Sequence, residues 1–433
     1  MTPQSNFMVL ASVAAGKTDD LRRLLASMNG RPGVVDPQNP LVPFAQLTRL
    51  HFARFLVLED VTLGDITAYN LPRINYPTYL TFLGDFDGPF DTFLADLQHQ
   101  AGEGLKRIFS YCDDFASGSD VLSWMKSHNV RPATIYVNWI GRTTQQVREE
   151  EALRQAMVKF IQENAASLWI MPSRQVYDKL TKFVKAEQQA GRITLTRPEP
   201  TPFGWKVRNF LDLVGVPLIL LALSPFLLLY LPFFVFQLRR REKSDPEISP
   251  RIDPAHARQL ADLEDHDIAN QFSAMGSVKP GLFRRWALTF FLWVLNYTTQ
   301  HIYNRGRLAR VTTIHFARWA FLDGRKRLLF ASNYDGGLES YMDDFINKVA
   351  FGLNLVFSNG IGFPSTNFLL FGGAQRELEF KYYLRRHQIP TQVWYKAYPE
   401  LTAADLARNS MIRAGLQDRL TTDAEARQWL ALI

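Results

Sequence analysis

The chain has 433 residues, a length that predicts about two to four domains of ~100–200 residues each. Hydrophobic residues make up 47% and charged residues 21%, which excludes a disordered or low-complexity protein. The net charge of +7 is mild for this length, so we expect no nucleic-acid partner. The single cysteine, Cys112, excludes an intrachain disulfide and a cysteine-built metal site.

The first half carries strand and helix patterns in the order β-α-β-β-α-β, which is that of a ferredoxin-like domain. Residues 1–16 have no basic segment before their apolar stretch, so we expect a mostly cytosolic chain rather than a secreted one. Helices are predicted from Thr18, which acidic residues follow, and from Phe90, after the turn at Asp87-Gly88. Runs of β-forming residues predict strands at 7–13, 51–58, 79–83 and 134–140.

A further helix is predicted over 143–165. Its charged residues are expected on one solvated face. They are Arg148, Glu149, Glu150, Glu151 and Arg154.

Residues 213–238 carry no charged side chain, and the run exceeds the ~20 residues that a membrane span needs. Pro217, Pro225 and Pro232 interrupt it, and each removes a backbone donor. Around Pro225 the run divides into pieces of about 12 residues, each roughly 18 Å long and too short to cross a ~30 Å hydrocarbon core. We therefore predict a kinked hairpin that enters one leaflet without crossing.

Basic residues flank this run on both sides, with Lys206 and Arg208 before it and Arg239 to Arg241 and Lys243 after it. A single span would concentrate basic residues on the cytoplasmic side, so we expect both ends on the cytoplasmic face, against anionic head groups. The predicted membrane-binding residues combine the run, its basic flank and two later tryptophans. They are Leu220, Phe226, Leu229, Phe233, Arg239, Arg240, Arg241, Trp286 and Trp293.

The second half repeats the order of the first. The apolar stretch 286–299 suits an interfacial helix and a core helix equally well, and Trp286, Trp293 and Tyr297 are residues that sit at a head-group boundary. Strands are predicted at 272–278, 313–322, 327–332 and 391–398, and helices at 283–297, from 338 and at 403–416.

Short matches between the halves indicate an internal duplication. His51-Phe52-Ala53-Arg54 recurs as His315-Phe316-Ala317-Arg318, and Asp87-Gly88 recurs as Asp335-Gly336. A weaker match pairs 134–137 with 392–395. We predict an α+β protein of two tandem ferredoxin-like domains, 1–191 and 267–433. The linker 192–266 holds the membrane hairpin at 213–238, and the repeat independently favours both domains on one side.

The sequence lacks the local signatures of several enzyme classes. It contains no HExxH, GxSxG, P-loop or GxGxxG motif. The repeated histidine and arginine are expected on opposite faces of a strand, either as framework residues or as a haem ligand and an anion-binding arginine. The repeated aspartate either caps the helix that follows it or takes part in chemistry.

Residues 84–88 form a G-x-x-D-G pattern that, with the tandem halves, resembles the dye-decolorising peroxidases and the wider dimeric α/β-barrel superfamily. The resemblance implies that a motif aspartate assists peroxide cleavage beside an arginine and that a histidine of the second half binds haem. It therefore points to Asp87 and its repeat Asp335 as proton shuttles, and to Arg54 and Arg318 as stabilisers of the developing anion. The haem iron ligand would be His315, followed by His301 and His387.

Two functions are compatible with these patterns. The first is a membrane-associated, haem-dependent, peroxidase-like oxidoreductase that acts on a lipid-like or other hydrophobic small molecule. The alternative is a non-catalytic membrane-anchored module that binds a lipid or a protein partner. Both place membrane lipids among the partners, and both leave the oligomeric state open.

Overall fold

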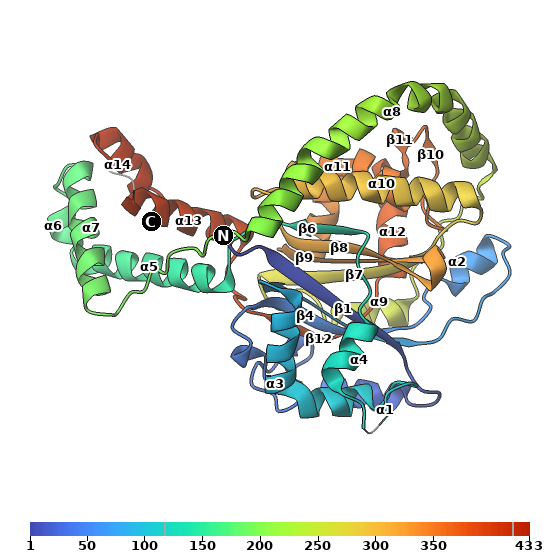
Figure 1. Cartoon of the computed structure of the whole chain (residues 1–433), viewed down its shortest axis with the longest axis horizontal. Helices are drawn as coiled ribbons and strands as arrows, with labels where there is room; N and C mark the ends of the chain where they lie inside the picture. The colour runs from blue at the N-terminus through green and yellow to red at the C-terminus, as the bar shows by residue number, and fades with distance from the viewer. Residues whose placement is uncertain (117, 418–419) are drawn as a thin grey trace.

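The computed structural model describes residues 1–116, 118–417 and 420–433 and contains two four-stranded antiparallel sheets (Figure 1). The first has the order β1 (Gln4–Ser12), β5 (Tyr79–Asp87), β4 (Leu50–Leu58) and β12 (Thr391–Lys396). The second has the order β7 (Ala269–Ser277), β9 (Arg327–Asp335), β8 (Ile314–Leu322) and β6 (Thr134–Val137). The α+β class is therefore confirmed.

Each sheet takes its last strand from the other half of the chain. β6 precedes the apolar segment yet pairs with β8, whereas β12, near the end of the chain, pairs with β4. The sheets therefore do not divide into two self-contained ferredoxin-like domains at 1–191 and 267–433. The strand pattern could not predict this exchange because it gives the faces of a strand but not the sheet edge that the strand joins.

The two sheets repeat the same register. Gln4 lies opposite Asp87 and Ala269 lies opposite Asp335, and a bulge interrupts β4 at His51 and β8 at His315. In the exchanged strands Tyr136 lies opposite Ala317 and Tyr395 lies opposite Ala53. The pairing thus matches 134–137 with 393–396, one residue away from the match predicted by sequence.

Helices cover the outer face of each sheet, and two short two-stranded hairpins lie in the connecting loops. The first sheet is covered by α1 (Thr18–Ala26), α3 (Phe90–Phe109) and α4 (Val121–Ser127). The second is covered by α10 (Leu282–His301), α11 (Leu338–Phe357) and α12 (Glu377–His387). The remaining short elements are β2 (Asn29–Arg31), β3 (Val34–Val35), α2 (Leu63–Ala68), α9 (Pro254–Ala261), β10 (Thr366–Asn367) and β11 (Phe371–Gly372).

A helical arm projects from one end of the body (Figure 1). It contains α5 (Thr144–Glu163), α6 (Ala165–Leu168), α7 (Ser173–Gln189), α13 (Ala403–Gln417) and α14 (Asp423–Leu430) around its own apolar cluster. Because α13 packs on α5, part of the predicted solvated face of 143–165 is covered: Glu150 is buried near Arg413, and Glu151 accepts a hydrogen bond from Asn409. That expectation is corrected for these two residues.

Two buried arginines connect the sheets reciprocally. Arg54 of β4 donates to the carbonyls of Phe272 (3.1 Å) and Ser332 (2.9 Å) in the second sheet. Arg318 of β8 donates to the carbonyls of Phe7 (2.7 Å) and Gly84 (3.1 Å), which hold the equivalent positions in the first sheet. The contacts show that both side chains point between the sheets, where Met8, Leu83, Met275 and Leu329 form the apolar layer.

The negative charge of Asp85 stabilises both buried guanidinium groups, by an ion pair with Arg318 and at longer range with Arg54. Asp85 forms an ion pair with Arg318, and the equivalent residue Asn333 offers its amide oxygen to Arg54. Burial and the Arg318 charge lower the pKa of Arg54 to about 9, whereas Asp85 opposes this shift. Because the two guanidinium groups are buried and repel each other, Asp85 is the group that makes the arrangement electrostatically tolerable.

Replacing Asp85→Ala is expected to lower the free energy of unfolding by about 3–5 kcal/mol, because Arg318 then stays buried without a counter-charge. Asp91→Ala is the matched control: Asp91 is exposed and pairs with Lys126, so its loss is expected to cost less than about 1 kcal/mol. Denaturant titration measures both values. Equal losses in the two variants would show that the buried pair is not critical, and the double variant Asp85→Leu with Arg318→Met should recover part of the loss.

Candidate functional site

The structure joins the repeated histidines and aspartates into two buried pairs. His51 Nε2 lies 2.9 Å from Asp87 Oδ1, and His315 Nε2 lies 2.6 Å from Asp335 Oδ1. The bulges turn both rings toward the opposite sheet, so that His51 contacts Phe316 and His315 contacts Phe52. The expected alternation of the histidines and Arg54 or Arg318 on opposite strand faces is therefore interrupted at the bulge.

Both aspartates also hold the start of a helix. Asp87 Oδ2 accepts hydrogen bonds from the Thr144 amide (2.8 Å) and hydroxyl (2.9 Å) at the start of α5. Asp335 Oδ2 accepts one from the Ala403 amide (2.7 Å) at the start of α13. A carboxylate stabilises these helix N-termini. The capped helices are thus α5 and α13, rather than α3 and α11, which directly follow the two aspartates.

A small cavity lies between the two histidines. It has a volume of about 20 Å³, enough for about one water molecule, and is lined by His51, His315, Arg142 and Tyr398, among others. The Tyr398 hydroxyl lies 2.9 Å from His51 Nδ1, which is consistent with Tyr398 donating to His51 and His51 donating to Asp87. Burial and Asp87 raise the pKa of Tyr398 well above its ordinary value of about 10, so the hydroxyl stays protonated.

Arg142 closes one side of this cavity. Its guanidinium lies 4.4 Å from the centre of the Trp139 ring, and its Nε and one Nη have no hydrogen-bond partner among the described residues. No motif or repeat singles out Arg142 or Tyr398. Thr143 and Thr144 were recognisable only as the start of a helix.

None of the three predicted haem histidines lines a cofactor-sized cavity among those described. His315 is bonded to Asp335 and lines a cavity of about 20 Å³, and His387 lines a second cavity of about 20 Å³. Ligand cavities for larger cofactors measure ~300–1,000 Å³. His301 lies at the end of α10, against Tyr297, and lines none of the cavities that we describe. The described residues also form no group of three or more His, Cys, Asp or Glu side chains suited to a metal.

Arg54 and Arg318 lie between the sheets and contact carbonyls there, away from the cavity between the histidines. Asp87 and Asp335 use both carboxylate oxygens in contacts within the chain. These four residues therefore hold the two halves and the arm together. Their expected catalytic roles stay predictions. None of the cavities of substrate size described for this structure is lined by Arg54, Arg318 or Asp335.

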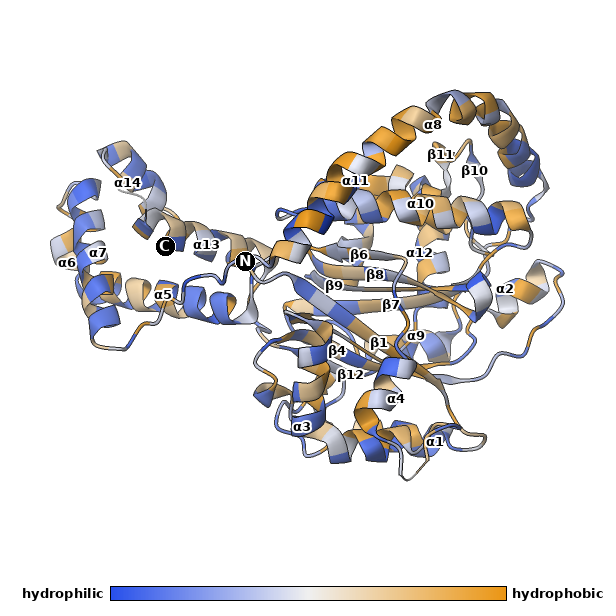
Figure 2. Cartoon of the chain, in the orientation of Figure 1, coloured by the Kyte–Doolittle hydropathy of each residue, from blue (hydrophilic) through white to orange (hydrophobic). Residues whose placement is uncertain are grey.

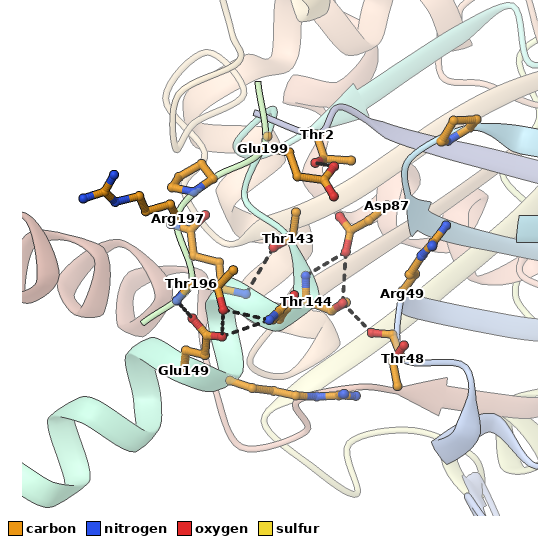
Figure 3. A pocket seen from close by; sticks show the side chains of 16 residues that line it. Thr2, Thr48, Arg49, Asp87, Thr143, Thr144, Glu149, Thr196, Arg197 and Glu199 are labelled. Carbon is orange, nitrogen blue, oxygen red and sulfur yellow. Dashed lines mark hydrogen bonds between the residues drawn. The ribbon is translucent and has the colours of Figure 1, made fainter. Parts of the chain in front are cut away.

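A larger cleft of about 720 Å³ lies beside Asp87, between the body and the arm (Figure 3). Arg49, Arg148 and Arg197 line it, and so do Glu149 and Glu199. Glu149 accepts hydrogen bonds from Thr196, which closes one wall. Counted with Asp87, three carboxylates face three arginines, so the lining charges balance. Sequence analysis missed this cleft because distant segments assemble it.

The apolar run forms one helix, α8 (Phe203–Ser244), and not a hairpin. Among the described residues it is the one helix that is long and apolar enough to cross a membrane, by length and composition. The helix continues through Pro217, Pro225 and Pro232 and curves over α10 as an arch (Figures 1 and 2). Each proline removes one backbone bond but the neighbouring turns keep theirs, so the prolines bend the helix without ending it.

Both ends of the arch are attached to the same body. Near its beginning, the Leu213 carbonyl accepts a hydrogen bond from Tyr297, at the end of α10. Near its end, Phe234 packs on Phe283, at the start of α10. Asp245, directly after α8, forms ion pairs with Lys279 (2.8 Å) and with the buried Arg284 (2.5 Å). α8 therefore lies antiparallel to α10.

The buried carboxylate of Glu242 ties the end of α8 to the β10–β11 loop. It accepts hydrogen bonds from the amides of Phe368 and Leu369, both at 3.0 Å. These two residues have positive φ angles of 55° and 61°, a conformation that turns successive amides toward one anion. Sequence analysis did not single out Glu242, because it lies within a basic flank.

The predicted membrane residues divide into exposed and attached groups. Phe226, Leu229, Phe233, Trp286 and Trp293 are exposed, and Leu220 is half-buried. Arg240 is exposed, but Arg239 pairs with Glu242 and Arg241 lies over Phe283. Arg239 and Arg241 therefore help to anchor α8, and their role in binding head groups stays a prediction.

The helix α10 has both a buried face and exposed apolar side chains. Its Ala287, Leu288 and Leu292 side chains are buried, whereas Trp286 and Trp293 are 63% and 41% exposed. The buried face agrees with the prediction of a core helix, and the interfacial role of 286–299 stays a prediction.

Comparison with protein-family models found no match, and comparison with curated proteins found no significant match. The resemblance to the dye-decolorising peroxidases therefore stays a prediction from residues 84–88 and the repeat.

Burial lowers the pKa of His387, although Asp65 opposes the shift, so we expect this histidine to be neutral in the folded chain. Below pH ~6.5 the unfolded chain binds a proton that the folded chain does not, and stability falls as the pH falls toward the lowered pKa. Between pH 7.5 and 5.5 the wild type should lose about 1 kcal/mol more than His387→Gln. Denaturant titrations at the two pH values measure the difference, and parallel losses would contradict a neutral buried His387.

Proposed function

We propose that the protein is a monotopic membrane protein that inserts the face formed by α8 and α10 into one leaflet and binds a lipid-like molecule there. The observation that carries this proposal is the exposed apolar arch of α8, with Leu229 81% exposed, beside the exposed tryptophans of α10. Contiguous apolar surface of this kind marks a membrane or partner interface, and tryptophans favour the head-group boundary.

The attachment of α8 favours insertion without crossing. A helix of 42 residues is about 63 Å long, twice the ~30 Å of a hydrocarbon core. Its two halves are held at the two ends of α10, which itself packs on β6 and the second sheet. A crossing α8 would have to break one of these attachments or draw α10 into the bilayer.

Between the two expected functions, the cavities favour the non-catalytic module. The histidines proposed for haem have no cofactor-sized space. The apolar face and the basic residues at its edge offer contacts to lipid in the absence of any cofactor. We propose a location on the cytoplasmic face, because basic residues flank α8 on both sides.

A cysteine placed at Pro200 and one placed at Ser249, on either side of α8, should react with an impermeant maleimide from the same side of sealed vesicles. The native Cys112 provides a quiet background, since it is buried and burial raises the pKa of its thiol to about 12. Wild-type protein is the control and should label only after denaturation. Labelling of the two positions from opposite sides would show that α8 crosses.

The double variant Arg240→Gln with Lys243→Gln should bind vesicles of phosphatidylcholine and phosphatidylglycerol less tightly, by roughly 30-fold at ~1 kcal/mol per charge. Both residues are exposed at the edge of the apolar face. Lys182→Gln with Lys185→Gln, on the exposed side of the arm helix α7, removes the same charge and should bind like the wild type. Flotation measures the bound fraction, and an equal loss in both variants would contradict the orientation.

A further inference from the structure

A cavity of about 260 Å³ lies where the apolar face meets the body, beside the start of α10. We call it the edge cavity. It is lined by the segment after α2, by residues 277–281 and Arg285, and by Lys326 and Ile361. Figure 1 shows α2 and the loop after it near this end of the body. The volume is slightly below the ~300–1,000 Å³ of whole-ligand cavities, so it suits part of a lipid rather than all of it.

The charged residues that line the edge cavity are all basic. They are Lys279, Arg285 and Lys326, and no carboxylate lines the cavity. Lys279 is paired with Asp245, whereas Arg285 and Lys326 form no ion pair among the described residues. The first turn of α10, a 20-residue helix, contains no acidic residue of its own, and the nearby carboxylate of Asp245 is already paired with Lys279 and Arg284. Two available cations and a helix N-terminus favour a phosphate.

The rest of the lining is apolar. Ile66, Leu71 and Ile74 form one wall of the edge cavity. Val278 and Ile361 also line the cavity. A free phosphate would leave this wall uncovered, whereas the glycerol and first acyl carbons of a phospholipid would cover it. The ligand chemistry is therefore a phosphate joined to an apolar group.

The edge cavity also lies at the depth where head groups are expected. The next exposed residues of α10 are Leu282 (67%) and Trp286 (63%), which belong to the apolar face. Arg325, next to Lys326, lies 5.5 Å from the Trp286 ring centre. A tryptophan with basic neighbours is typical of the membrane–water boundary.

We propose that the edge cavity binds the phosphate head group of an anionic phospholipid from the leaflet that holds α8 and α10. This inference rests on the proposed membrane function and gives it a ligand class. Arg285 and Lys326 hold the phosphate, the start of α10 points its amides toward it, and the wall of Ile66, Leu71 and Ile74 covers the glycerol end.

Calorimetric titration of the full chain in neutral detergent tests the site with three soluble probes: dihexanoyl-phosphatidylglycerol, dihexanoyl-phosphatidylcholine and inorganic phosphate. We expect saturable one-to-one binding of the phosphatidylglycerol and at least tenfold weaker binding of the other two probes. Arg285→Gln with Lys326→Gln should weaken phosphatidylglycerol binding at least tenfold. Ile74→Trp, which fills the mouth without changing charge, should weaken it as well.

Arg307→Gln with Arg310→Gln is the matched control, because both residues are exposed, lie after the other end of α10 and form no ion pair among the described residues. Equal weakening in this control would show that only general charge attracts the lipid and would overturn the site. Equal binding of inorganic phosphate would overturn a lipid as its source. Flotation with phosphatidylcholine vesicles separates the two proposals: no vesicle binding contradicts the membrane function, whereas retained vesicle binding without saturable binding of soluble dihexanoyl-phosphatidylglycerol contradicts only the edge cavity.

Discussion

The exchange of arginines between the two sheets is the interaction on which the rest of the structure depends. Arg54 and Arg318 each bind backbone carbonyls of the opposite sheet, so neither sheet satisfies its own central arginine. Buried charges of this kind contribute little net stability but strongly penalise any arrangement that leaves them unpaired. The face-to-face packing is thereby fixed in one alignment, in which His51 and His315 lie across the sheets from each other and line the small central cavity.

The polar centre and the apolar face lie in different parts of the molecule and make separate contacts. The two His–Asp pairs hold the arm helices through Thr144 and Ala403. The face of α8 and α10 lies on the other side of the second sheet, with its attachments made by Asp245 and Glu242. Haem chemistry at the centre would need a cofactor-sized space beside His315, where the cavity measures about 20 Å³. Binding at the apolar face needs only surface that is already exposed, and this contrast is why we favour a lipid-binding module over an oxidoreductase.

Local patterns predicted much of the fold. The strands, most helices, the repeated HFAR and Asp-Gly segments and the apolar run were all recognisable, because each depends on residues that are close in sequence. The strand exchange, the edge cavity and the partners of Glu242 were not, because each joins segments far apart in the chain. Proline was also misleading in α8: it signals a break, but a long apolar helix tolerates three of them by bending. The resemblance to a peroxidase rested on residues whose side chains hold the framework here.

The exchanged strands set the order in which the chain can fold. The first sheet lacks its edge strand until β12 has been made, long after β4, and β6 has no partner until β8, which lies beyond α8. The apolar helix therefore leaves the ribosome while both sheets are still open and while β4 has an unpaired edge that is prone to aggregation. Capture of α8 by a bilayer at that stage would hold the unfinished chain at a surface and keep its open edges apart, so that a membrane would also act on the assembly of the chain.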